Sequence, residues 1–143
     1  MIKNHPLDTG LVDYKQLINE TCESLNINKS RIQYLETGHL EQLLRSTAGV
    51  VLINSTVGIT ALKENCKVIA LGKAIYNIEN LCYSGSLDNF WVSKFSPNEQ
   101  LFNDFNLYLL NKTQILGNLY EQPGIDIGIK NTLAKRLLND KNY

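Results

Sequence analysis

Residues 49–62 read GVVLINSTVGITAL, an apolar stretch that is interrupted by three polar residues in its middle. Gly49–Ile53 is rich in β-branched and aliphatic residues, which is typical of a parallel strand that is covered on both faces. Val57–Glu64 has the composition of a helix, and Lys67–Leu71 (KVIAL) is a second short apolar run. The stretch therefore predicts a strand, a helix and another strand in close succession, as in the βαβ unit of a parallel sheet.

The residues before this stretch repeat the same alternation of elements. Ile2–His5 has the character of the end of a strand, and residues 31–35 (RIQYL) predict a short strand. Asp13–Leu25 predicts a helix, because its apolar residues recur at helical spacing: Tyr14, Leu17, Ile18, Cys22 and Leu25. His39–Ala48 predicts another helix. The fold class is therefore α/β, with a Rossmann-like, doubly wound parallel sheet expected in a single domain over residues 1–143.

The region after Gly72 predicts helices rather than further strands. A short helix is expected within Ser86–Ser93, and a last one near Ile127–Leu138. Between them, Ser96-Pro97-Asn98-Glu99 has the pattern of a helix start with Ser96 at the N-cap. The helix that follows should bury one face, formed by Leu101, Phe105, Tyr108 and Leu109. The aromatic residues are expected in the core rather than on a base-stacking surface: Phe90, Trp91, Phe102 and Phe105.

Composition excludes several classes of function. Fourteen basic residues balance fourteen acidic ones, so no net charge attracts nucleic acid. The apolar runs are too short to span a bilayer, and the first ten residues contain no apolar signal-peptide segment. Three scattered cysteines without a CxxC pair, together with two histidines, predict buried reduced thiols rather than a zinc site. We expect a cytoplasmic protein that needs neither a metal nor a cofactor.

Polar side chains follow the predicted strands directly, at His5, at Asn54-Ser55-Thr56 and at Gly72-Lys73. The carboxyl ends of parallel strands meet at one sheet edge, where α/β proteins bind ligands. Ser55 or Thr56 is suited to cap the next helix, whose first N–H groups are expected to lack partners and to favour an anion. Gly58 would let a phosphate approach the backbone. Two interpretations stay open: a phosphate site, or hydroxyls that only cap a helix.

Other polar residues add less. The His5 imidazole could donate a hydrogen bond to a phosphate oxygen, and Lys73 could add a positive charge, although both types are more often structural or solvated. His39 is expected at the start of a helix in a capping or exposed position. The sequence contains neither GxGxxG nor GxxxxGK[ST], so no dinucleotide or P-loop motif supports the site.

Four blocks of sequence carry a resemblance to a known family. They are KNHPLDTGLVDY (3–14), GHLEQLLRSTAGVVLINSTVGITAL (38–62), KVIALGKAIYNIENL (67–81) and GSLDNFW (85–91). Their residues and order resemble the capsule polysaccharide biosynthesis/export family, whose members are similar to β-Kdo transferases. The resemblance covers most of residues 3–91, and the NSTVG block is most specific in combination with the two flanking blocks.

The resemblance implies the carboxyl-terminal, donor-binding half of a GT-B glycosyltransferase that uses CMP-Kdo. His5 matches the family's His-Pro motif, and Ser55 and Thr56 match its hydroxyl pair; these groups are implied to hold the CMP phosphate. Asn54 and Gly58 match the same block in a supporting role. Gly85, Ser86 and Asp88 match the later block without an assigned duty.

The departures from the family pattern decide which alternatives stay open. Asn4 stands where a second basic or histidine residue is expected, and Cys82-Tyr83 stands where Thr-His is usual. The carboxylates implied to perform catalysis belong to an amino-terminal domain outside this sequence. The chain is therefore expected to be a fragment that is inactive alone. The alternatives are a non-catalytic nucleotide-binding or scaffold component of a capsule assembly or export complex, and a module for another sugar nucleotide. An amino-terminal half or other capsule assembly proteins are the expected partners, at the inner face of the inner membrane.

Overall fold

The structure of the chain is a computed structural model that describes residues 1–5, 7–113, 122–126 and 128. The chain divides into two compact units, unit 1 (Met1–Ser46) and unit 2 (Thr47–Tyr143). The helix predicted near Ile127–Leu138 falls outside the described residues except for Gly128. The single domain over residues 1–143 stays a prediction.

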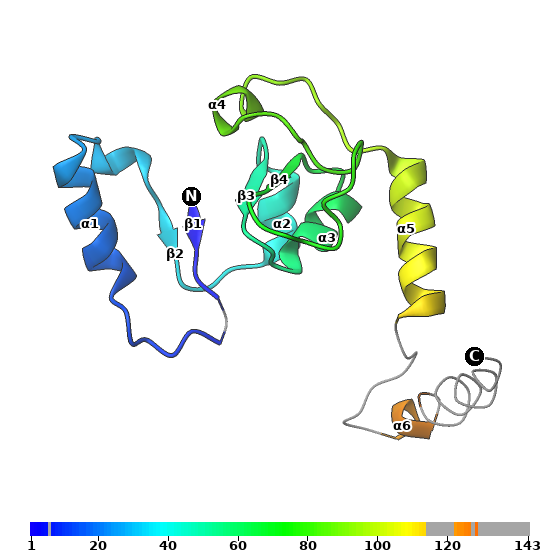
Figure 1. Ribbon diagram of the computed structural model, residues 1–143. Coiled ribbons are helices and arrows are strands. Elements are labelled where there is room, and N and C mark those ends of the chain that lie inside the picture. Colours follow the sequence, from blue (N-terminus) through cyan, green and yellow to red (C-terminus); the bar gives the residue numbers. More distant parts are fainter. Residues whose placement is uncertain (6, 114–121, 127, 129–143) are drawn as a thin grey trace. The chain divides into compact units, whose positions relative to one another are not determined.

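Unit 1 contains a βαβ arrangement with a short helix after it (Figure 1). Strand β1 pairs in parallel with β2, with Ile2 opposite Tyr34 and Lys3 opposite Leu35. The elements are β1 (Ile2–Lys3), α1 (Tyr14–Ser24), a 3-10 turn η1 (Lys29–Arg31), β2 (Tyr34–Leu35) and α2 (Leu40–Arg45). The predicted strand over residues 31–35 is therefore shorter than expected, because η1 takes its first residue.

The two helices of unit 1 begin where the sequence predicts them. The Asp13 carboxylate accepts a hydrogen bond from the Gln16 N–H at 2.9 Å and thereby caps α1. His39 occupies the N-cap position of α2, although its side chain makes no capping hydrogen bond. Both starts confirm the periodicity analysis.

Unit 2 contains a second βαβ arrangement, β3–α3–β4, and its described residues then form the helices α4, α5 and α6 (Figure 1). Strands β3 and β4 are parallel, in a register that places Val50 opposite Val68 and Leu52 opposite Ala70. The elements are β3 (Val50–Leu52), α3 (Val57–Lys63), β4 (Val68–Ala70), α4 (Leu87–Phe90), α5 (Glu99–Lys112) and α6 (Gly124–Asp126). The opening stretch GVVLINSTVGITAL thus folds as the sequence predicts.

The core of unit 2 forms around β4 and the aromatic residues that follow it. Phe90 is fully buried, and its ring lies 5.6 Å from that of Tyr83 and 4.8 Å from that of Trp91, measured between centroids. The Lys67 ammonium donates hydrogen bonds to the carbonyls of Phe90 and Ser93, at 2.5 and 2.9 Å. Lys67 therefore ties the end of α4 to the start of β4.

Helix α5 begins two residues later than the sequence predicts. Its N-cap is Asn98, whose side chain accepts from the Leu101 N–H at 2.9 Å, and the expectation of Ser96 in this role is wrong. The Ser96 hydroxyl donates instead to the Asn65 side chain. The buried face of α5 consists of Phe102, Phe105 and Leu109, whereas Tyr108 is exposed.

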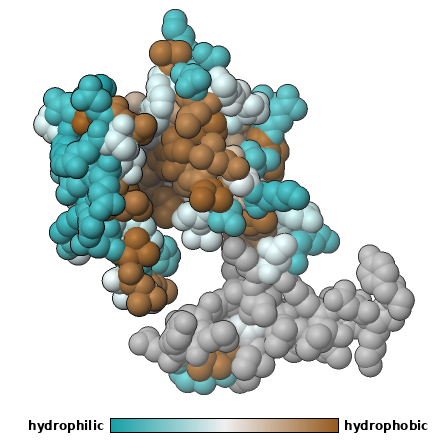
Figure 2. Space-filling model, turned by 60° about the vertical axis from the view of Figure 1, so that its left-hand side comes forward, coloured by the Kyte–Doolittle hydropathy of each residue, from teal (hydrophilic) through white to brown (hydrophobic). Residues whose placement is uncertain are grey.

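Many large apolar side chains are exposed, and Figure 2 shows apolar residues in brown on the surface. Val51 in β3 is 36% exposed, so the expectation that this strand is covered on both faces is wrong. Trp91 was expected in the core, but it is 52% exposed, so this prediction is wrong. Phe90 and Phe102 are buried, as predicted. Among the described residues, no helix combines the length and the apolar character that crossing a membrane requires.

The architecture confirms the α/β class. Within the described residues, each unit contains a small parallel sheet of two strands, and a helical crossover connects the two strands of each sheet. This arrangement is compatible with a Rossmann-like fold.

Candidate functional site

The loops after β3 and β4 leave the same edge of the sheet in unit 2. The parallel ladder continues past the strands, because the N–H groups of Leu71 and Gly72 donate to the carbonyls of Leu52 and Ile53 at 2.7 and 2.9 Å. Asn54 comes next in one loop, and Lys73 comes next in the other. This edge is where ligands bind in open α/β sheets.

The first backbone N–H groups of α3 were expected to be unpaired, but they have hydrogen-bond partners within the chain. The Val57 N–H donates to the Ser55 hydroxyl oxygen at 3.3 Å, and the Gly58 N–H donates to the Ser55 carbonyl at 3.0 Å. The Ile59 N–H donates to the Thr56 carbonyl at 3.0 Å. The expectation that these first N–H groups lack partners is therefore wrong, and Ser55 satisfies two of them.

The side chains of this loop can still act as hydrogen-bond donors. The Ser55 hydroxyl accepts from a backbone N–H, so its own proton can be donated to another acceptor. Thr56 is exposed, occupies the N-cap position and makes no capping bond with its side chain. Asn54 and Lys73 are exposed as well. Within the described chain, the Asn54 amide, the Thr56 hydroxyl and the Lys73 ammonium have no hydrogen-bond or ion-pair partner.

Gly58 has a packing role that the sequence did not reveal. It is buried in the first turn of α3, and a side chain there would collide with the ring of Tyr76. The Tyr76 hydroxyl donates to the Ser55 carbonyl at 2.5 Å. The missing side chain at Gly58 is thus explained by Tyr76, and contact of Gly58 with a phosphate stays a prediction.

The GSLDNFW block is tied to the opposite end of β3 and β4. Gly49 and Lys67, which precede these two strands, both lie against Phe90 at the end of α4. Ser86 is the N-cap of α4, and its hydroxyl accepts from the Asn89 N–H at 3.3 Å. Asp88 lies in the first turn of α4. These contacts do not bring Ser86 or Asp88 to the hydroxyl loop, and their part in binding stays a prediction.

His5 lies in a tight turn after β1 in unit 1. Its Nδ1 accepts from the Leu7 N–H at 3.1 Å, and its carbonyl accepts from the Asp8 N–H at 3.1 Å. The Asn4 side chain supports this turn, because its amide group donates to the Asp8 carboxylate at 3.2 Å and its oxygen accepts from the His5 N–H at 2.9 Å. Since Nδ1 is an acceptor, the neutral imidazole carries its proton on Nε2, where it can be donated.

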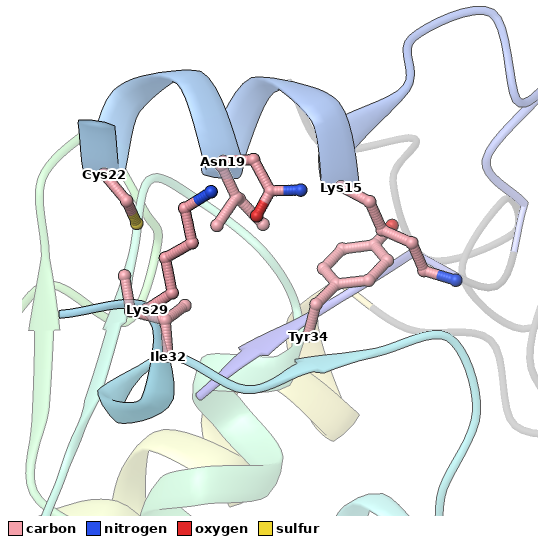
Figure 3. Close-up of a pocket in the computed structure, with 7 residues that line it drawn as sticks. Lys15, Asn19, Cys22, Lys29, Ile32 and Tyr34 are labelled. Atoms are coloured by element: carbon pink, nitrogen blue, oxygen red, sulfur yellow. The ribbon is translucent and has the colours of Figure 1, made fainter. Parts of the chain in front are cut away.

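Unit 1 also contains an open pocket of about 260 Å³ that the sequence did not predict (Figure 3). Side chains from α1 face those from η1 and β2 across it. The lining residues are Lys15, Ile18, Asn19, Cys22, Lys29, Ile32 and Tyr34.

The two lysines of this pocket already have carboxylate partners. Lys15 pairs with Glu36 at 2.5 Å, and Lys29 pairs with Glu23 at 2.7 Å. The hydrogen bond and charge of Glu36 raise the pKa of the Lys15 ammonium, and those of Lys29 lower the pKa of the Glu23 carboxyl. Because both charges are matched, the pocket is a poor site for an anion.

All three cysteines are buried free thiols, as predicted, at positions 22, 66 and 82. Burial raises the pKa of the Cys66 thiol and raises that of Cys82 to about 11. Neither thiol is therefore a reactive thiolate at neutral pH. Within the described residues, no group of histidine, cysteine and carboxylate side chains could hold a metal ion.

Sequence reasoning missed Tyr76 and Lys67 as structural residues of unit 2. Tyr76 stands in AIYNIEN, where neither helical nor strand periodicity marks a buried residue. Lys67 opens the KVIAL run and is a residue type that is normally exposed. No local signal in the sequence indicates that Tyr76 contacts Ser55 or that Lys67 contacts Phe90.

These observations define an α/β protein in which two adjacent loops, one with hydroxyl residues and one with a lysine, leave the carboxyl edge of a parallel sheet. The chain belongs to the capsule polysaccharide biosynthesis family, since the profile described as capsule polysaccharide biosynthesis protein matches residues 1–120. This confirms the family resemblance of the sequence.

Three curated proteins are similar to this chain over most of its length. The capsule polysaccharide export protein KpsS of Escherichia coli is 41% identical over 115 residues, which are 80% of this chain and 29% of KpsS. The capsule polysaccharide modification protein LipB of Neisseria meningitidis serogroup B is 38% identical over 122 residues, 85% of this chain and 29% of LipB. Protein FixF of Sinorhizobium fredii is 31% identical over 114 residues, 76% of this chain and 27% of FixF. The chain thus spans less than a third of these relatives, and no solved structure matches it.

Proposed function

We propose that this chain supplies the donor-binding part of a capsule polysaccharide glycosyltransferase of the GT-B type. The ligand is CMP-Kdo or a related sugar nucleotide, and its phosphate is held by the hydroxyls of Ser55 and Thr56. Membership of the capsule polysaccharide biosynthesis family supports the biological setting. The observation that carries the proposal is the exposed hydroxyl loop at the carboxyl edge of β3, next to the loop of Lys73.

The chemistry of the loop suits a phosphate. Hydroxyl protons on Ser55 and Thr56 can be donated to phosphate oxygens, and the Lys73 ammonium can offset part of the negative charge. The Asn54 amide offers two further N–H donors beside them. Because Ser55 also caps α3, the two interpretations of the hydroxyls are compatible: one hydroxyl oxygen accepts from the helix while its proton contacts the ligand.

On the strength of the family resemblance, His5 is proposed as a further residue that donates a hydrogen bond to the phosphate of the sugar nucleotide. Its turn fixes Nδ1 as an acceptor and leaves the Nε2 proton available to a phosphate oxygen. His5 lies in unit 1, so its contribution is measured separately, through a His5→Gln variant in the same binding assay.

Thermal unfolding with and without CMP tests the proposal. A ligand at a hundred times its dissociation constant stabilises the folded chain by about 2.7 kcal/mol, which raises the midpoint by about 9 °C. We expect the shift with CMP, a smaller one with UMP and GMP, and a strongly reduced but measurable one with CMP in the Ser55→Ala/Thr56→Ala variant.

A matched control is available in unit 1. Thr21 and Ser24 are exposed hydroxyl residues of α1 whose side chains bond only to helix carbonyls. The Thr21→Ala/Ser24→Ala variant should keep the full CMP shift. A larger shift with UMP or GMP would assign the site to another sugar nucleotide, and no shift with any nucleotide would contradict donor binding and favour the scaffold alternative.

A further inference from the structure

Tyr76 connects the two loops that leave the carboxyl edge of unit 2. Its side chain is 1% exposed, although it lies in a loop between β4 and α4. Its hydroxyl donates to the Ser55 carbonyl at 2.5 Å, and its ring occupies the space that the missing side chain of Gly58 leaves open. One buried side chain thus contacts both ends of the Ser55–Gly58 turn.

The backbone of Tyr76 is held in place as well. Its carbonyl accepts from the Ile78 N–H at 2.8 Å and from the Cys82 thiol at 3.3 Å. Cys82 is itself 2% exposed. Burial raises the pKa of the Tyr76 phenol, so its hydroxyl is protonated and remains a donor at neutral pH.

The bond to Ser55 constrains the group that the proposed function uses. The Ser55 carbonyl accepts from both the Tyr76 hydroxyl and the Gly58 N–H, which fixes the orientation of the peptide unit between Ser55 and Thr56. The direction of the Ser55 side chain and the start of Thr56 both follow from that peptide unit. A shift of the carbonyl would therefore move both hydroxyls together.

We propose that Tyr76 is a positioning residue for phosphate binding, which acts on the hydroxyls of Ser55 and Thr56 through the Ser55 carbonyl. Tyr76 is buried and does not touch the ligand itself. The inference rests on the proposed function, and it assigns to the loop after β4 the task of holding the loop after β3 in its binding geometry.

A double-mutant cycle tests this role. Tyr76→Phe keeps the ring against Gly58 and removes only the hydroxyl, and the dissociation constant for CMP is measured by calorimetry in two backgrounds. In the unaltered chain we expect about fivefold weaker CMP binding, in keeping with the loss of one hydrogen bond. In the Ser55→Ala/Thr56→Ala background, Tyr76→Phe should cause no further change, because the groups that it positions are absent.

Tyr83→Phe is the matched control, since Tyr83 packs on Phe90 and Phe95 in the same unit. It should leave CMP binding unchanged. A merely structural role of Tyr76 would lower the thermal midpoint and leave the dissociation constant unchanged, measured well below that midpoint. If Tyr76→Phe does not fold, Gly58→Ala displaces the ring and keeps the hydroxyl, and it should weaken CMP binding in the same non-additive way.

The outcomes separate the two proposals. Failure of the unaltered chain to bind CMP overturns the proposed function and this inference with it. CMP binding by the unaltered chain that Tyr76→Phe does not weaken, or weakens equally in both backgrounds, overturns only the positioning role.

Discussion

The two βαβ arrangements of this chain share one topology and differ in how well they bury their residues. Among the residues that the structure describes, the buried apolar ones of unit 1 are Cys22 and Leu44. In unit 2 they are Ala61, Leu62, Cys66, Val68, Ile69, Tyr76, Leu81, Cys82, Phe90, Phe102, Phe105 and Leu109. A sequence pattern that specifies strand–helix–strand connectivity therefore does not by itself specify a core.

The crossover helices explain part of this difference. Helix α1 reads YKQLINETCES and is polar on most of its surface, so Leu17 on its apolar side remains 49% exposed. Helix α3 reads VGITALK, and its Ala61 and Leu62 are 0% and 3% exposed. The burial of apolar area is the main favourable contribution to folding, so most of the stability should reside in unit 2.

Removal of a core ring from unit 2 should have the largest effect. Phe90→Ala deletes a fully buried ring that packs against Tyr83 and Trp91. We expect a loss of about 3–5 kcal/mol in the free energy of unfolding. The measurement is denaturant unfolding followed by the fluorescence of Trp91, the single tryptophan of the chain.

The same type of truncation in unit 1 provides the contrast. Leu17→Ala removes a half-exposed side chain from α1 and should cost less than about 1 kcal/mol, measured for both variants by denaturant unfolding followed by circular dichroism, which reports on the helices of both units. Equal losses in the two variants would contradict the comparison, because they would mean that α1 is as well packed as the core of unit 2.

Gly58→Ala should have the next largest effect. The added methyl group would collide with the Tyr76 ring, and overpacking of this kind costs about 1–3 kcal/mol. Circular dichroism with denaturant gives the value. Tyr76→Leu in the Gly58→Ala background should recover part of the loss by making room, so strictly additive losses would argue against the collision.

Alkaline pH should weaken unit 2 through its buried thiols. Burial raises the pKa of the Cys82 thiol from its ordinary value of 9.0 to about 11. The unfolded chain therefore loses this proton above pH 9, whereas the folded chain keeps it until about pH 11, and the stabilising contribution is complete below pH 9. Between these values the free energy of unfolding should fall by about 1.4 kcal/mol per pH unit at most.

Cys82→Ser isolates this contribution, because serine does not titrate in the window and can still donate to the Tyr76 carbonyl. Thermal midpoints from pH 8 to pH 11 should decline less steeply in the variant. An unchanged slope would show that other groups, such as Cys66 or the tyrosines, cause the decline.

The sequence predicted those features of the structure that depend on local signals, and it did not predict contacts between residues far apart in the chain. Strands β1, β3 and β4 and helices α1, α3 and α5 were predictable, because short apolar runs and helical spacing are local signals. The contact of Tyr76 with Ser55 and that of Lys67 with Phe90 were not, since they join residues 21 and 23 positions apart without a motif. The hydroxyl loop was predictable from its place after an apolar strand, whereas the hydrogen bonds that already occupy the first N–H groups of α3 were not.

The smallest expected effect concerns the start of α5, where Asn98 is the N-cap in place of the predicted Ser96. Asn98 accepts from the Leu101 N–H, whereas Ser96 bonds to Asn65 outside the helix. Asn98→Ala should therefore lower the free energy of unfolding by about 1 kcal/mol, and Ser96→Ala by less than half of that.

Asp13→Ala removes the equivalent cap from α1, and it should reduce helicity by circular dichroism without moving the Trp91 transition of unit 2. If the Trp91 transition shifts as much for Asp13→Ala as for Asn98→Ala, the two units unfold together. The units would then still differ in how well they bury their residues, but the stability of the chain could not be assigned mainly to unit 2.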